Sequence, residues 1–127
     1  MKYYFSQNMQ VGYINFTTCM GGNTKNAYDP TTGIFTAPQT GRYSFKILMV
    51  INNPKQSGYY YEIAFRVNDK AKYYLFGTST LFSFSNDSRH FSVEYDLASG
   101  DRVGFYNLYH SDNTFDYYSF IEGKLVK

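Results

Sequence analysis

The sequence has no tryptophan and only one cysteine, Cys19. A single cysteine excludes a disulfide within the chain and argues against a metal site built from several thiolates. We expect Cys19 to be a small hydrophobic side chain that is buried or half-buried. A disulfide to another chain, or a reactive thiol, is the alternative.

Clustered basic charge is also missing. The 12 Lys and Arg residues are scattered, never three in a row, and the net charge is only +2 at pH 7. Binding to nucleic acid requires basic side chains gathered on one face, so we expect no nucleic-acid partner. No apolar stretch approaches the roughly 18 residues of a membrane span, so we expect no membrane insertion.

The chain starts at Met1 without a basic and apolar leader, so no signal peptide is visible. Two explanations stay open. Either the protein is not secreted by that route, or the chain is a mature fragment with an added Met.

Aromatic side chains are abundant, with 15 Tyr and 12 Phe, and 43% of the residues are hydrophobic. Ala, Leu and Met, which favour helices, are few. Aromatic and β-branched residues fit the half-buried surface of a sheet. At 127 residues the chain is one domain by length, and the composition predicts that it is all-β.

Turn signals such as Thr32-Gly33, Asn68-Asp69, Asn86-Asp87 and Ser99-Gly100 recur mostly every 8 to 15 residues. This spacing is typical of a sandwich or a barrel. The segments between the turns predict strands at 11–17, 34–36, 42–51, 59–68, 72–77, 89–97, 102–109 and 117–126.

Alternation of apolar and polar residues supports several of these strands. In 59–68 one face should be core and the other wet, since Ile63, Phe65 and Val67 alternate with Glu62, Ala64 and Arg66. In 89–97 the inward residues should be Phe91, Val93, Tyr95 and Leu97.

Two predicted strands are apolar on both faces. The strand at 42–51 has Leu48 and Val50 opposite its main apolar face, and the strand at 117–126 has Tyr118 and Phe120 there. The sandwich core can cover only one face of each strand. We expect a neighbouring subunit to cover the other, with the chain's own loops as the alternative. Tyr118, Phe120, Leu48 and Val50 are therefore the predicted subunit interface.

The stretch "YDPTTGIFTAPQTGRYSF" at 28–45 resembles the signature of the C1q globular-head family in the C1q/TNF superfamily. The matching positions are Asn23, Tyr28, Phe35, Gly41, Tyr43 and Phe45. Two positions depart from the pattern: Phe16 lies one residue too far upstream, and Ile47 stands where an aromatic is usual.

The C-terminal half is also similar to this family. The stretch "DLASGDRVGF" resembles its loop and following strand, and "SFIEGKLV" resembles its closing strand, with matches at Ser119, Ile121, Gly123, Leu125 and Val126. The resemblance implies an antiparallel jelly-roll sandwich of two sheets, ten strands and a homotrimer. It places the globular domain at 10–127 and leaves 1–9 as an N-terminal extension or edge segment. The family's collagen-like stalk is absent from this chain, which has no Gly-x-y repeat.

Catalysis has little support, because His90 and His110 have no partner at the spacing of a known catalytic or metal motif. Calcium is the cofactor to consider, since some members of the family hold it through loop carboxylates and carbonyls. Asp87 falls on one such acidic position, but the companion position falls near Ser79, which is not a carboxylate. Asp112 and Asp116 could serve instead, although we expect them to be solvated turn acids.

Adjacent tyrosines such as Tyr73-Tyr74 and Tyr117-Tyr118 recur, and each pair on a strand should leave one ring outside the core. An exposed ring can stack on a sugar or a protein partner, or it can cover an interface or an edge. A lectin-like pocket would use a similar mixture of polar and aromatic loop residues, which gives a candidate ligand site at Asn107, Tyr109, His110 and Asp112.

Taken with the resemblance, these features predict a secreted, extracellular and non-catalytic trimer that recognises glycans or microbial or protein surfaces through its loops, as lectins and pattern-recognition molecules of innate immunity do. Two alternatives stay open. One is a TNF-like ligand that binds a receptor, and the other is a structural head that trimerises a stalk or fibre.

Overall fold

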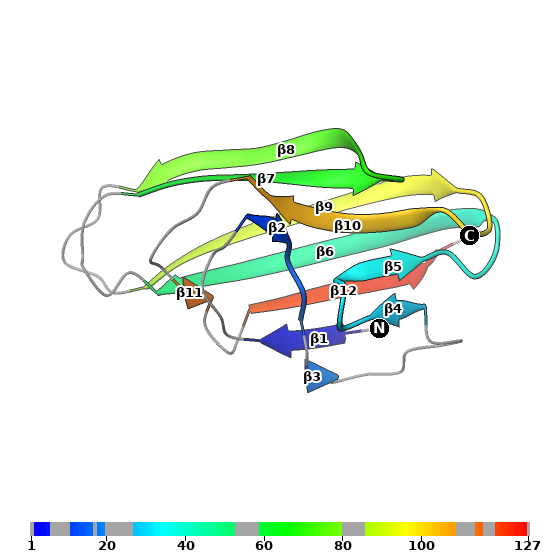
Figure 1. Cartoon of the computed structure of the whole chain (residues 1–127), viewed down its shortest axis with the longest axis horizontal. Coiled ribbons are helices and arrows are strands. Elements are labelled where there is room, and N and C mark those ends of the chain that lie inside the picture. Colours follow the sequence, from blue (N-terminus) through cyan, green and yellow to red (C-terminus); the bar gives the residue numbers. More distant parts are fainter. Residues whose placement is uncertain are drawn as a thin grey trace.

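Strands make up most of the described chain (Figure 1). The computed structural model describes residues 2–5, 11–16, 18–19, 27–52, 59–79, 86–108, 114–115 and 119–126. None of these residues belongs to a helix, so no helix in this part of the chain could cross a membrane. The prediction of an all-β domain is confirmed.

One sheet, called sheet A below, is built around the long strand β6 (Gly41–Asn52). β6 pairs on one side with β9 (Asn86–Leu97), and on the other with β12 (Ser119–Leu125) and the short β11 (Thr114–Phe115). The sheet continues from β12 to β1 (Lys2–Phe5) and then to β3 (Thr18–Cys19). All of these pairs are antiparallel.

The second sheet, sheet B, has β10 (Arg102–Asn107) at its centre. On one side β10 pairs with β7 (Tyr59–Val67), which pairs with β8 (Lys70–Ser79). On its other side lie β5 (Ile34–Thr36) and β2 (Gly12–Tyr13), and β5 pairs with β4 (Tyr28–Asp29). This sheet is also antiparallel throughout, and the two sheets form the layers visible in Figure 1.

Aromatic rings fill the space between the sheets. Phe45 of β6 contacts Phe35 of sheet B at 5.2 Å between ring centroids and Phe65 of β7 at 5.8 Å. The inward residues of β6, from Tyr43 to Met49, are essentially inaccessible to solvent. The period-two alternation predicted for the strands therefore places the core correctly on this side of β6.

Two of the predicted turns have backbone conformations that suit their residue types. Asn68 and Asp69 both have positive φ, 51° and 66°, and they join β7 to β8 as a two-residue hairpin turn. Gly33 has φ +77°, and a Cβ there would lie 2.5 Å from the carbonyl oxygen of Ile14, so only glycine fits. The turn within the stretch at 28–45 thus depends on close contact with a distant segment.

Several boundaries differ from the sequence prediction. The strand at 34–36 is confirmed, but β1, β3, β4 and β11 were not expected. β1 lies between β12 and β3 within sheet A. The turn expected at Asn86-Asp87 is wrong: β9 already begins at Asn86, since its ladder with β6 continues to Asn52.

The face of β7 expected to be wet is partly covered. Ala64 is only 1% exposed, although it points away from the core. Its neighbours across the strands are Tyr106 and Tyr74, whose larger side chains flank its methyl group. A small residue between two large ones is buried on a sheet surface even when no second layer covers it.

Ser119 extends the bonding between β12 and β6 beyond the end of their ladder. Its buried hydroxyl accepts a hydrogen bond from the Val50 amide at 2.8 Å and donates one to the Val50 carbonyl at 3.1 Å. The Ser119 side chain thus satisfies the amide and the carbonyl of Val50 on the β12 side of β6. On the other side of β6, Val50 lies opposite Ser88 of β9.

We expect Ser119→Ala to lower the free energy of unfolding by about 1–3 kcal/mol, because two backbone groups of Val50 lose their partner in a part-buried position. Urea denaturation followed by circular dichroism measures the change. Ser92→Ala, on the exposed face of β9, is the matched control and should change stability by less than about 0.5 kcal/mol. Equal losses in the two variants would contradict this role of Ser119.

Candidate functional site

The outer face of sheet A carries the residues predicted as a subunit interface. Phe120 lies directly opposite Leu48 in the β12–β6 ladder, and His90 lies opposite Leu48 on the other side. Val50 is two residues farther along β6 and therefore on the same face. Leu48, Val50 and Phe120 are half-buried and are called the apolar patch below.

The other end of the same face is charged. Arg42 donates to Asp96 at 3.0 Å and to Glu94 at 3.2 Å, and the pKa of Arg42 is raised chiefly by the hydrogen bond to Asp96. Lys46 and Glu122 lie opposite one another between this end and the apolar patch. The charges at the Arg42 end pair within the chain, whereas the apolar patch is left with a half-exposed hydrophobic surface.

The fold brings three of the four predicted interface residues onto one face, because β6 and β12 are neighbours in sheet A. Tyr118 lies outside the described residues. The role of the patch as an interface stays a prediction, since the described chain is a single copy.

Of the four residues of the predicted ligand site, the structure describes Asn107 alone. Asn107 does not lie in an exposed loop: it is the last residue of β10, paired with Ile63 and Gly12, and its exposed fraction is 0%. An inward-pointing strand residue cannot contact a ligand at the surface of this conformation. Tyr109, His110 and Asp112 lie outside the described residues.

The position suggested for calcium is also different from the expectation. Asp87 belongs to strand β9, where it lies opposite Ile51, rather than to a loop. Its side chain is not described. Ser79, at the companion position, is the last residue of β8. Within the side chains that the structure describes, no group of three or more His, Cys, Asp or Glu residues is placed to hold a metal.

A charged and aromatic cluster on the outer face of sheet B was not found from the sequence. It consists of Tyr13, Arg66, Asp69, Arg102 and Tyr106, and is called the Arg66 cluster below. The guanidinium carbon of Arg66 lies 3.6 Å from the centroid of the Tyr106 ring and 5.7 Å from that of Tyr13. The two rings are perpendicular and 5.1 Å apart.

Asp69 anchors one side of the Arg66 cluster. Its carboxylate accepts a hydrogen bond from the Tyr13 hydroxyl at 2.6 Å and one from Arg102 at 3.0 Å. These hydrogen bonds hold the pKa of Asp69 below its usual value, and the bond from Tyr13 contributes most. The pKa of Tyr13 is raised, chiefly by burial and then by its bond to Asp69. In the sequence, the Asn68-Asp69 turn was the one signal that pointed to this cluster. Tyr13 and Tyr106 are far apart in the chain and become neighbours only when β2 pairs with β10.

Searches for related sequences gave no match: no protein-family model matches the chain, and no curated protein does. Solved structures do match. The globular domain of the zebrafish complement 1qA protein superposes with a TM-score of 0.66 at 13% identity, over 99% of this chain and 94% of that one.

Two structures of GITRL are also similar. The rabbit protein gives a TM-score of 0.54 at 18% identity, over 76% of this chain and 73% of that one. The pika protein gives 0.52 at 19% identity, over 75% and 77%. The chain therefore has the C1q/TNF-like jelly-roll fold, as its sequence resemblance implied.

We expect Tyr13→Phe to raise the pKa of Asp69 toward its ordinary value near 3.8, because the hydroxyl that contributes most to lowering it is gone. Titration of the carboxyl carbons by NMR measures this. Asp101 is the internal control, since the pKa of its carboxyl is lowered by hydrogen bonds from Asn68 and the Ala98 amide, which the substitution does not touch.

The pH dependence of the free energy of unfolding should reflect this lowered pKa of Asp69. A lowered folded-state pKa means that Asp69 contributes stability above about pH 4 and that this contribution is lost as the pH falls through the folded pKa. The Tyr13→Phe variant should therefore lose less stability than the wild type on acidification from pH 5 toward pH 2. An unchanged Asp69 pKa, or a shift of Asp101 as large as that of Asp69, would contradict the assignment.

Proposed function

We propose that this protein is a secreted, non-catalytic recognition module that acts as a homotrimer and binds glycans or microbial or protein surfaces through its loops. The observation that carries the proposal is the apolar patch on the outer face of sheet A, in a chain with the C1q/TNF-like fold. Trimers are typical of proteins with this fold, which supports a second and third copy as the cover of the patch.

The register of sheet A supports the patch as a contact surface. Leu48 and Phe120 are adjacent across two strands, so they present one continuous apolar area rather than two isolated side chains. Burying such an area against a partner is favourable in proportion to the apolar surface removed from water. Lys46 and Glu122, at the border of the patch, would supply a polar rim.

Trimerisation would serve recognition through avidity. Three identical loop sites held at a fixed short separation raise the effective concentration for the second and third contact, so weak individual contacts add to useful binding. Tyr109, His110 and Asp112 are the loop residues that we propose for ligand contact, and calcium is a proposed aid to these loops rather than a structural requirement.

The similarity to the two GITRL structures supports a second candidate, a TNF-like ligand that engages a receptor protein between its subunits. The two candidates share the trimer but differ in where the partner binds. Substitutions in the loops at 109–112 should abolish binding in the first case. Substitutions at the borders between subunits should do so in the second.

We expect the protein in solution to have a mass near three times 14.8 kDa by light scattering, both with calcium and with EDTA. Leu48→Glu and Phe120→Glu should each shift the mass to that of the monomer, because a charge buried at an interface without a partner is unfavourable. Val11→Glu is the matched control: Val11 is apolar and 56% exposed but lies outside the patch, so its replacement should leave the mass unchanged.

Circular dichroism of each variant separates loss of assembly from loss of folding. A wild-type monomer at all concentrations, with or without calcium, would overturn the trimer and the avidity argument with it. A trimer that is retained in both patch variants would place the interface elsewhere.

A further inference from the structure

The outer face of sheet B carries the positive charge of Arg66, whose guanidinium lies on tyrosine rings. Arg66 forms no ion pair with the carboxylates of the described residues, and its Nε is shielded from solvent without a hydrogen-bond partner among them. Asp69 is the carboxylate bound within the cluster, and its two oxygens are taken by Tyr13 and Arg102. The rings of Tyr106 and Tyr13 lie against the guanidinium of Arg66, whose charge also acts on the Asp69 carboxylate without a direct ion pair.

The guanidinium of Arg66 is held in a defined orientation. It stacks on Tyr106 at 3.6 Å, and the perpendicular ring of Tyr13 stands beside it. Gly104, opposite Arg66 in the β10–β7 ladder, leaves the space that the Tyr13 ring occupies, since a Cβ at Gly104 would lie 2.7 Å from that ring. The bond from the Tyr13 hydroxyl to Asp69 then fixes the ring from its other end.

A permanently charged guanidinium held in this way suits a carboxylate, to which its terminal nitrogens can donate hydrogen bonds, whereas Nε is shielded from solvent. Because the stacked side chain is already ordered, little conformational entropy is lost when it binds. The preorganisation distinguishes Arg66 from Arg42 on the opposite sheet, whose guanidinium is already paired with Asp96 and Glu94.

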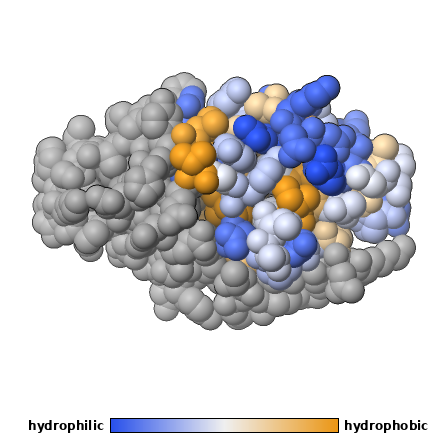
Figure 2. Space-filling view, viewed as in Figure 1, coloured by the Kyte–Doolittle hydropathy of each residue, from blue (hydrophilic) through white to orange (hydrophobic). Residues whose placement is uncertain are grey.

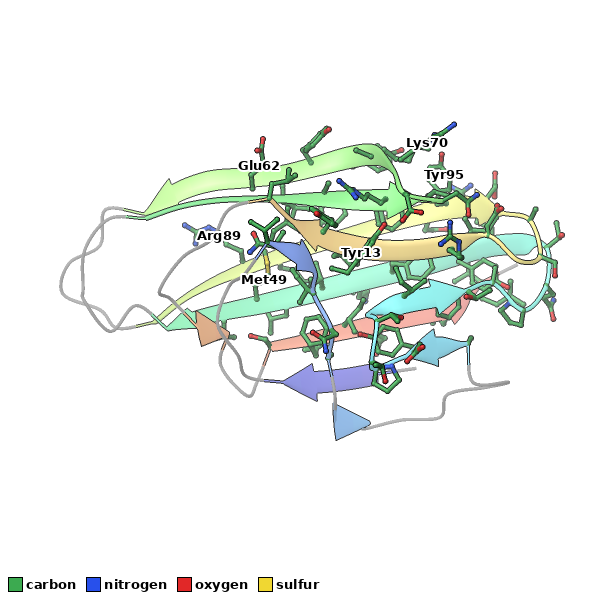
Figure 3. The ribbon with its side chains drawn as sticks, in the orientation of Figure 1. Tyr13, Met49, Glu62, Lys70, Arg89 and Tyr95 are labelled. Atoms are coloured by element: carbon green, nitrogen blue, oxygen red, sulfur yellow. The ribbon has the colours of Figure 1, made fainter. Side chains whose placement is uncertain are left out.

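The surroundings of Arg66 favour a sugar. Tyr74 of β8 is 55% exposed and lies two strands from Tyr106, with the buried methyl group of Ala64 between them. The exposed ring of Tyr74 is a surface of the kind on which a sugar ring can stack. Figure 3 shows Tyr13 alongside β10 and Lys70 at the turn between β7 and β8. In the coloured part of Figure 2, apolar residues are scattered among hydrophilic ones.

We propose that the Arg66 cluster is a binding site for an acidic sugar, whose carboxylate is bound by Arg66 and whose ring rests on the neighbouring tyrosines. The site lies on the outer face of sheet B, and it requires no second subunit. It therefore goes beyond the proposed function and can stand or fall independently of the trimer.

The test is an NMR titration of the full chain with sialyllactose, which carries one carboxylate, and with lactose, its neutral counterpart. We expect sialyllactose to shift the signals of Arg66, Tyr106 and Tyr74, and lactose to leave them unchanged. Arg66→Gln should weaken binding by about tenfold or more, since charge-assisted hydrogen bonds to the carboxylate are lost. Arg42→Gln is the matched control and should bind as the wild type does.

A second variant tests the electrostatics in the opposite direction. Asp69→Asn removes the negative charge nearest to the site while keeping an oxygen that can accept from Tyr13, and Asn tolerates positive φ. We expect this variant to bind sialyllactose about two- to threefold more tightly, because a like charge near the ligand is removed. A purely structural role of the cluster would not produce tighter binding.

Three outcomes would overturn the proposal: no shift of these signals with sialyllactose, equal shifts with lactose, or unchanged binding in a folded Arg66→Gln protein. A glutamate-rich peptide is the third titrant, and binding of that peptide in preference to sialyllactose would also overturn the assignment to a sugar. The mass by light scattering is measured in parallel. A trimer whose loops bind neutral glycans would sustain the proposed function while this site failed.

Discussion

The contact between Phe45 of β6 and Phe65 of β7 joins the two sheets, and the rest of the structure depends on it. Phe45 also packs on Phe35, and Phe65 also packs on Phe105 and Tyr95, so rings from both sheets form one connected core. Aromatic pairs of this kind contribute attraction beyond the area that they bury. Large rings fill the space between the sheets with few residues, and this leaves the outward positions of each strand available for other uses.

The outer faces of sheet A and sheet B differ in composition. On sheet A an apolar patch at Leu48 and Phe120 borders a charged end at Arg42, whose charges are satisfied within the chain. On sheet B the reverse holds, because the charge of Arg66 rests on tyrosine rings and lacks a paired carboxylate in the described structure. The first face suits a protein surface of the same kind, and the second suits an anion. These differences are the physical basis for two separate proposals, assembly through sheet A and binding of an acidic sugar on sheet B.

Sequence reasoning succeeded where the signal was periodic and local. The alternation in β6 and β7 gave the buried faces, and the Asn68-Asp69 turn was found because few residues tolerate positive φ. It failed where pairing with a distant strand outweighed local preference. Asp87 was expected in a turn but is held in β9 by the ladder with β6. Asn107 was expected to contact a ligand but is buried at the end of β10. The short strands β3, β4 and β11 have too few residues to show a period.

The sequence by itself determined the all-β class, the jelly-roll resemblance and the second apolar face of β6, because these follow from residue type and from a period of two along one strand. Only the tertiary structure decided which residues lie side by side across strands. Phe120 meets Leu48, and Tyr13 meets Tyr106 and Arg66, through registers set by the whole sandwich. Such neighbours are far apart in the chain, and no local pattern specifies the register that brings them together.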